Sequence, residues 1–192
     1  MPESDALAVA RAREGDSQAF RALVERHSRT IFRLAHRMTG NEHDAEDVVQ
    51  ETFLRAFRQL DRFEARANFG TWLYRIAVNC SIDLMRKRRE ATTDEPDGME
   101  QMATSSPHGQ GDAPDLDRLV FSAEIRQRVG AALDRLSQME RAAFVLRHFE
   151  GQSIDEIGRA LGLRSNATKH SIFRAVRKMR AALQPLVDAG PG

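Results

Sequence analysis

The chain has 192 residues, 41% hydrophobic and 30% charged, which is enough to bury a core and remain soluble. Its 29 basic and 28 acidic residues nearly cancel, and no apolar run approaches the roughly 20 residues of a membrane helix, so we expect no membrane insertion. A single cysteine excludes an internal disulfide, and the acidic N-terminus lacks the apolar segment of a signal peptide, so a cytoplasmic protein is expected.

Apolar residues recur at helical spacing along most of the chain, and no alternating strand pattern occurs. In the N-terminal half we predict a short helix near residues 5–14 and then a long one, from Asp16 or Ser17 to the stop signal Gly40-Asn41. The next helix has the apolar stripe Ala45, Val48, Val49, Thr52, Phe53, Ala56, Phe57 and Leu60, and a further helix has Leu73, Ile76, Ala77, Cys80 and Leu84. Together these helices predict a compact bundle.

Two surfaces of this bundle could have a function. The outer face of the helix beginning near Ala45 carries acidic and polar side chains, which alone are typical of a solvated surface. A metal site is not expected there, because His43, Asp44, Glu46 and Asp47 are predicted to point around the helix rather than converge. Farther along, Phe63, Phe69, Trp72 and Tyr74 precede the basic run 86–89, a combination that suits single-stranded DNA. Packing of Trp72 in the core is an equally good explanation.

From Ala91 to about Pro114 the chain is rich in polar residues, glycine and proline, which predicts a flexible linker. Helical periodicity returns at Ile125, and two capping boxes follow, at Ser137–Glu140 and Ser153–Glu156. The sequence thus predicts an all-α protein of two helical domains, residues 1–90 and 117–192, joined by a linker at 91–116.

The end of the chain has the pattern of a helix-turn-helix. A short helix, Ser153–Leu161, leads through Gly162 into a second helix from Ser165. The outer face of the second helix has the side chains Lys169, His170, Phe173, Arg174, Arg177, Lys178 and Arg180. Such a helix can enter the major groove, where lysine and arginine contact phosphates and arginine reads guanine. A solvated cationic helix in a bundle is the alternative.

Three segments together resemble the sigma factors of bacterial RNA polymerase, specifically the extracytoplasmic-function (ECF) group. They are the run Asp44–Ala56, the run Asn68–Asn79 with the basic residues after it, and the stretch from Leu136 to Gly162. The resemblance covers roughly residues 8–90 and 118–186. One departure lies in the last helix, where Ser171 replaces a frequent arginine of the family.

The resemblance implies roles for particular residues. Contact with the clamp helices of core RNA polymerase is implied for Asp47, Gln50, Glu51, Phe53 and Arg55. Binding of the melted −10 promoter element is implied for Phe63, Phe69, Trp72, Asn79, Arg86, Arg88 and Arg89. Reading of the −35 duplex is implied for Arg164, Lys169, His170, Phe173, Arg174 and Arg177.

The resemblance further implies a non-enzymatic protein that is monomeric when free, needs no cofactor and is regulated by an anti-sigma factor. The residues also show no phosphate-binding glycine loop, metal quartet or nucleophile–base pair. Three alternatives are a free-standing helix-turn-helix regulator, a protein-binding adaptor and an enzyme. The first would explain residues 137–186 but leave 44–56 and 68–89 without a role. Whether the free chain is compact or extended is left open.

Overall fold

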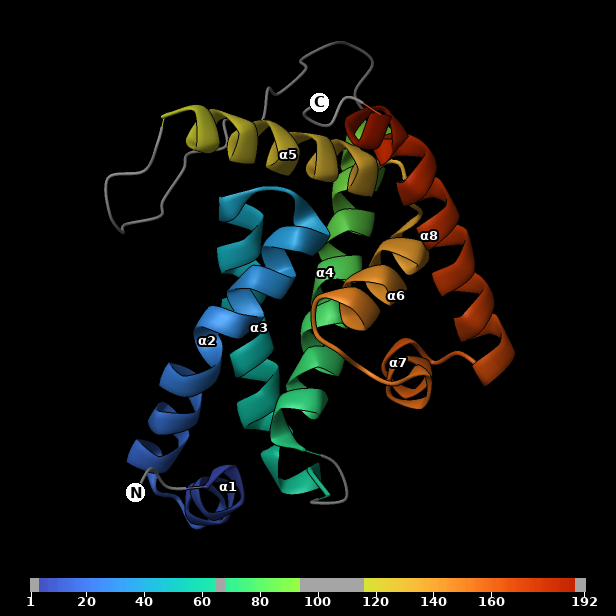
Figure 1. The fold of residues 1–192 in the computed structure, drawn as a ribbon. Helices are drawn as coiled ribbons and strands as arrows, with labels where there is room; N and C mark the ends of the chain where they lie inside the picture. Colours follow the sequence, from blue (N-terminus) through green and yellow to red (C-terminus); the bar gives the residue numbers. More distant parts are fainter. Residues whose placement is uncertain (1–3, 65–67, 94–115, 189–192) are drawn as a thin grey trace.

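The computed structural model describes residues 4–64, 68–93 and 116–188, and all regular structure in these ranges is helical (Figure 1). The elements are α1 (Asp5–Arg13), α2 (Ser17–Thr39), α3 (Glu42–Arg58), the short 3-10 helix η1 (Leu60–Arg62), α4 (Phe69–Thr93), α5 (Leu116–Asp134), α6 (Gln138–His148), α7 (Ile154–Leu161) and α8 (Ser165–Asp188). The predicted all-α fold is confirmed. None of the described helices is long and apolar enough to cross a membrane.

The helix ends follow the capping signals of the sequence. The Asp16 side chain accepts hydrogen bonds from the backbone N–H groups of Gln18 and Ala19, which begins α2. Gly40 ends α2 in the left-handed conformation, with φ of 84°, and Asn41 then caps α3. The predicted start and stop of the first long helix are therefore confirmed.

Helices α2, α3 and α4 lie side by side, and α1 crosses their lower end (Figure 1). Their shared core includes the fully buried side chains of Leu23, Leu34 and Leu73. One residue of the predicted apolar stripe is placed differently. Phe57 was expected in the core, but it is 58% exposed and packs edge-on against Phe20, with ring centroids 5.0 Å apart.

In the C-terminal half, α5 and α8 share a small core that includes Leu133, Ala175 and Met179. Helices α6 and α7 lie between α8 and α4, and their buried residues, Leu146 and Ile157 among them, belong to the same core cluster as α2–α4 (Figure 1). The two halves therefore pack directly against each other. Of the predicted linker 91–116, the first three residues continue α4, Leu116 begins α5, and 94–115 lie outside the described residues.

Polar contacts reinforce the packing between the halves. Arg37 of α2 approaches Glu150, with 3.3 Å between Nη1 and Oε1, and its guanidinium carbon lies 4.2 Å from the ring centroid of Phe149. The Glu150 side chain is only 7% exposed. The pKa of Tyr74 on α4 is raised to about 12, first because its hydroxyl is partly buried and then because Glu150 is negatively charged and hydrogen-bonded to it. Arg141 is buried and donates to the backbone oxygen of Arg37, with an Nε–O distance of 2.7 Å.

Candidate nucleic-acid interface

The outer face of α3 combines charge with exposed apolar surface. Asp47 and Gln50 are exposed, and Leu54 is 51% exposed. Glu51 accepts a hydrogen bond from Arg55, with an Oε1–Nε distance of 2.6 Å, and this bond raises the pKa of Arg55. Four of the five residues assigned to polymerase binding thus lie at or near this surface.

The remaining assigned residue of α3 lies inside the bundle. Phe53 is 8% exposed and belongs to the core, so any effect on a partner would pass through the shape of α3. The exposed aromatic ring of this face is instead Phe57. Helical spacing assigned it to the apolar stripe, and only its distance from the centre of that stripe could have indicated otherwise.

Three of the side chains near the start of α3 do converge. One donor atom each from His43, Asp44 and Asp47 lies within 4.8 Å of the others, so the expectation that these residues point apart is wrong for them. Asp44 is already paired, since its Oδ2 lies 2.7 Å from Nη1 of Arg88 and 2.7 Å from Nδ2 of Asn41. This carboxylate therefore ties the start of α3 to the basic end of α4.

The aromatic residues around the start of α4 form a cluster. The rings of Phe63, Phe69 and Trp72 contact one another, with centroid distances of 5.1–5.6 Å. Phe63 and Phe69 are buried, whereas Trp72 is partly exposed. Only Trp72 thus has open ring surface against which an unpaired base could stack, and the two phenylalanines support it from behind. Trp72 also packs against the core, so both sequence interpretations apply to it.

The opposite end of α4 is basic. Arg86, Arg88 and Arg89 are exposed, and so is Asn79 two to three turns earlier. Arg86 lies 3.3 Å from Asp83, and the Arg88 pair with Asp44 has been described above. Exposed ion pairs of this kind contribute little stability, so these guanidinium groups can exchange their partners for phosphates at small cost.

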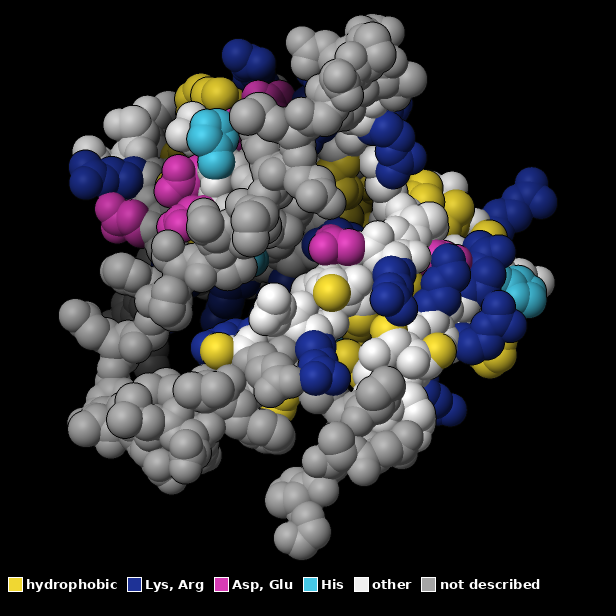
Figure 2. Space-filling model, turned by 90° about the horizontal axis from the view of Figure 1, so that it is seen from above, with side chains coloured by type: hydrophobic (Ala, Val, Ile, Leu, Met, Phe, Trp, Pro, Cys, Tyr) yellow, Lys and Arg dark blue, Asp and Glu magenta, His cyan; other side chains and the backbone are white. Residues whose placement is uncertain are grey.

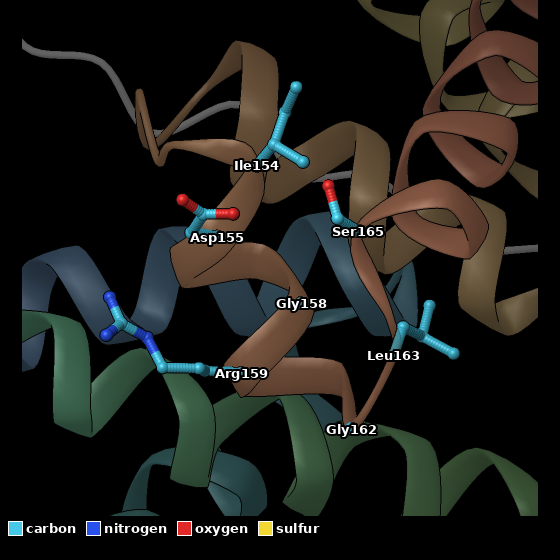
Figure 3. Close-up of a pocket in the computed structure, with 7 residues that line it drawn as sticks. All are labelled: Ile154, Asp155, Gly158, Arg159, Gly162, Leu163 and Ser165. Carbon is cyan, nitrogen blue, oxygen red and sulfur yellow. The ribbon is translucent and has the colours of Figure 1, made fainter.

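The helix-turn-helix is built by α7, the turn at Gly162 and α8. Ser153 and Glu156 form the predicted capping box at the start of α7, and Gly162 has a φ of 65° in the turn. Gly158 lets α7 approach the turn closely, because a Cβ there would lie 2.9 Å from the backbone oxygen of Leu163. An open groove runs beside this approach, between α7 and the start of α8, and Gly158, Leu163 and Ser165 line it (Figure 3).

The exposed face of α8 is strongly cationic. Figure 2 shows basic side chains and a histidine gathered on the side of the molecule where α8 lies. All six residues assigned to −35 recognition are exposed: Arg164, Lys169, His170, Phe173, Arg174 and Arg177. Phe173 is 65% exposed and stands among these cations, so its ring is available for an apolar contact beside them. Ser171, the departure from the family pattern, is buried and so lies off this face.

Glu140 of α6 pairs with the back of the cationic face. Its carboxylate lies 2.7 Å from Nζ of Lys178 and 3.3 Å from Nε of Arg174. Burial opposes its ionisation, but hydrogen bonds from Lys178 and the Ser137 backbone hold the pKa of Glu140 below its usual range. The Arg174 side chain is 56% exposed, so this pairing positions it without covering it.

Comparison with known families assigns both halves of the chain. Residues 23–91 match the family described as Sigma-70 region 2, and residues 126–179 match Sigma-70, region 4. The first match contains the segments that a free-standing helix-turn-helix regulator would leave unexplained. That alternative is therefore not favoured.

Related proteins and solved structures agree with this assignment. The chain is 33% identical to the "ECF RNA polymerase sigma-E factor" of Escherichia coli (strain K12), over 96% of each chain. It is 32% identical to "ECF RNA polymerase sigma factor SigW" of Bacillus subtilis (strain 168), over 93% of this chain and 96% of the relative. It spans 59% of the longer "ECF RNA polymerase sigma factor SigE" of Mycolicibacterium smegmatis, at 34% identity.

Two solved complexes have a similar fold. One is CnrH with the cytosolic domain of CnrY, with a TM-score of 0.66, 31% identity, and coverage of 98% of this chain and 100% of that one. The other is the sigma factor RpoE with the anti-sigma factor NepR from Bartonella quintana, with a TM-score of 0.67, 26% identity, and coverage of 86% and 96%. The chain therefore belongs to the ECF sigma factors of bacterial RNA polymerase and serves in transcription initiation.

Proposed function

We propose that this sigma factor docks on the clamp helices of core RNA polymerase through the outer face of α3. The exposed Leu54 and Phe57 supply apolar contact area, and Asp47 and Gln50 supply polar contacts beside them. Phosphodiester chemistry then belongs to the polymerase, so the proposal assigns this chain no catalytic residue and no cofactor.

The aromatic cluster is the proposed site for the melted −10 strand. An extruded base costs a few kcal/mol of stacking and pairing, which a stacking surface and hydrogen bonds must offset. The partly exposed Trp72 offers the ring, and Asn79 on the same helix offers a hydrogen-bonding amide. The basic residues Arg86, Arg88 and Arg89 supply phosphate contacts for the strand that leaves the site.

The face of α8 is the proposed reader of the −35 duplex, and one observation supports this most strongly. A cationic helix face with Phe173 65% exposed follows directly on the left-handed turn at Gly162. Lys169 and Arg177 fit phosphate contacts, Arg174 fits a guanine edge, and the Phe173 ring fits a thymine methyl group.

The proposed partners follow from the same assignment. The similar solved structures are complexes, one of them with an anti-sigma factor, and an anti-sigma factor is proposed to regulate this protein as well. The free protein is proposed to be a cytoplasmic monomer, since a sigma factor joins the polymerase as one copy and contacts DNA asymmetrically.

Run-off transcription tests the function directly. Purified core polymerase is incubated with fragmented genomic DNA, with and without this protein, and transcripts are mapped. Discrete transcripts that need the protein, with start sites sharing two upstream elements, are expected. If the protein binds DNA but yields no such transcripts, a regulator that acts outside the holoenzyme explains it better.

Polymerase docking can be tested with one substitution on α3. Leu54→Glu should weaken core-polymerase binding about tenfold or more, because it places a charge on the apolar part of the interface. Leu7→Glu is the matched control, since Leu7 on α1 is 54% exposed, compared with 51% for Leu54. Affinity is measured by titrating labelled protein with core polymerase. Equal losses for both variants would contradict docking through α3.

A further inference from the structure

The last residue of α1 is bound to a segment far away in the sequence. The guanidinium of Arg13 donates to the backbone oxygen of Leu60, with distances of 3.0 Å from Nε and 2.9 Å from Nη2. Nη2 also donates to the backbone oxygens of Asp61, at 3.4 Å, and Phe63. One side chain thus binds three carbonyl groups in and just after η1, and the oxygen of Leu60 accepts from the backbone N–H of Phe63 as well.

Arginine suits this position for a geometric reason. Its planar guanidinium presents five N–H donors in a fixed fork, so it can bind several carbonyl groups in one defined arrangement. A lysine would keep the charge, but its compact ammonium group cannot reproduce the fork. The contact therefore fixes the position of the backbone at Phe63, and not merely its distance from α1.

That backbone carries one wall of the aromatic cluster. The ring of Phe63 lies 5.1 Å from Trp72 and 5.6 Å from Phe69, measured between centroids. Phe63 is buried, so its ring cannot shift without moving the ring of Trp72 that it supports. Arg13 is thereby linked to the ring of Trp72 through the backbone and ring of Phe63.

A second contact from α1 reaches the cluster through His27. Asp5 at the start of α1 pairs with His27 of α2, with 2.9 Å between Oδ2 and Nε2. The His27 ring meets Phe69 edge-on at 5.5 Å between centroids. The two ends of α1 are thus connected to Phe63 and to Phe69.

We propose that Arg13 is a positioning residue for promoter melting, because it fixes the end of η1 and so holds Phe63 behind Trp72. The inference rests on the proposed function of the cluster in binding the −10 strand. Arg13 itself need not touch DNA. The role is therefore one of geometry, and it predicts that a variant which only keeps the charge will not function.

The test uses holoenzyme assembled from core polymerase and the full-length protein, on a promoter recovered by run-off transcription. Arg13→Ala and Arg13→Lys should each lower the permanganate reactivity of −10 thymines about tenfold. Affinity for core polymerase should stay within about twofold, since α3 is not altered. In the free protein, acrylamide quenching of Trp72, the only tryptophan, should change in both variants.

Arg21→Ala is the matched control, because Arg21 has a 70% exposed side chain and pairs with Glu25 on its own helix. It should leave melting and quenching unchanged. Wild-type melting with Arg13→Lys would overturn the proposal in favour of direct attraction between charge and DNA. If the Arg13 variants lose promoter melting and core-polymerase binding together, the substitutions destabilise the protein in general, and the proposal is overturned. If they lose neither, Arg13 has no role in melting. If wild-type protein itself gives no melting with core polymerase, the proposed function fails and not this inference alone.

Discussion

At the scale of single residues, Gly158 is a position in the helix-turn-helix that has no room for a larger side chain. An added Cβ would lie 2.9 Å from the backbone oxygen of Leu163 and 3.2 Å from Oγ1 of Thr168, which is buried. Neither neighbour can move freely, because one is backbone and the other is enclosed. Gly158→Ala should therefore lower the free energy of unfolding by about 1–3 kcal/mol, measured by chemical denaturation. Duplex −35 binding should weaken as well, since α7 and α8 are forced apart.

Gly130 provides the control for this substitution. It lies within α5, and a Cβ there would meet no atom within 4 Å. Gly130→Ala should raise stability by about 0.5–1 kcal/mol, because alanine favours the helix over glycine. If both alanine variants gain stability, the close approach of α7 to the turn is contradicted.

The candidate site was predictable for exposed charges and less so for aromatic residues. The cationic face of α8 could be assigned because arginine and lysine almost never occupy a core, so helical spacing alone places them outside. An aromatic ring, in contrast, can lie either in the core or on the surface. Phe57 lies on the edge of its stripe and is exposed, while Phe63 and Phe69 are buried. The role of Arg13 gave no sequence signal, because its acceptors are backbone groups that any residue carries.

At the scale of elements, the capping box of α7 should make stability depend on pH. The Glu156 carboxylate accepts from the backbone N–H and the hydroxyl of Ser153, at 2.8 and 2.7 Å, and these bonds hold the pKa of Glu156 below its ordinary 4.5. The stabilisation is present above pH 4.5 and disappears as pH falls through the lower pKa of the folded state. Glu156→Gln should cost up to about 1 kcal/mol at pH 7, and the cost should shrink as the pH falls below 4.5 and through the lower pKa of the folded state.

Thermal unfolding of both proteins across this pH range gives the measurement. A Ser153→Ala background is the control, because one of the two donors to Glu156 is then missing. In that background the Glu156→Gln substitution should cost less, so the two effects are not additive. A cost that stays constant between pH 7 and pH 3 would mean that the carboxylate charge contributes nothing.

The element boundaries were largely predictable, because each is marked by a local chemical signal. Asp16, Gly40 and the two capping boxes act within one turn of the helix they cap, so a short window of sequence contains the whole interaction. The packing of α6 and α7 against the N-terminal half could not be predicted in this way. Its contacts join residues more than a hundred positions apart, such as Arg37 and Glu150.

At the scale of the whole molecule, the packed arrangement conflicts with the proposed promoter contacts. A compact chain of this length has a radius of gyration of about 16 Å. Positions −10 and −35 lie about 25 base pairs apart, or roughly 85 Å at 3.4 Å per base pair. One rigid body of this size cannot span both elements, so the proposed contacts require the halves to separate in the holoenzyme. The contacts between them then set the cost of opening.

The pair Arg37–Glu150 is the contact most open to test. Glu150 is nearly buried against Arg37 and Tyr74, so replacing Arg37 leaves the carboxylate in the closed form with only its hydrogen bond to Tyr74, which costs about 1–3 kcal/mol. Glu150→Arg or Arg37→Glu should shift the free protein toward an open state with a larger radius of gyration, measured by small-angle X-ray scattering. Circular dichroism should remain unchanged, because each half keeps its helices.

The double variant Arg37→Glu with Glu150→Arg distinguishes a specific pair from general damage, because it restores opposite charges at the same two positions and should return the chain to the compact form. The exposed pair Arg21–Glu25 is the control, and its reversal should not change the scattering. Core-polymerase affinity should rise in the single variants, since binding then no longer has to overcome the closed state. Compact single variants would show that apolar packing alone holds the halves together. An expanded wild type would show that the halves are already separate before the polymerase binds.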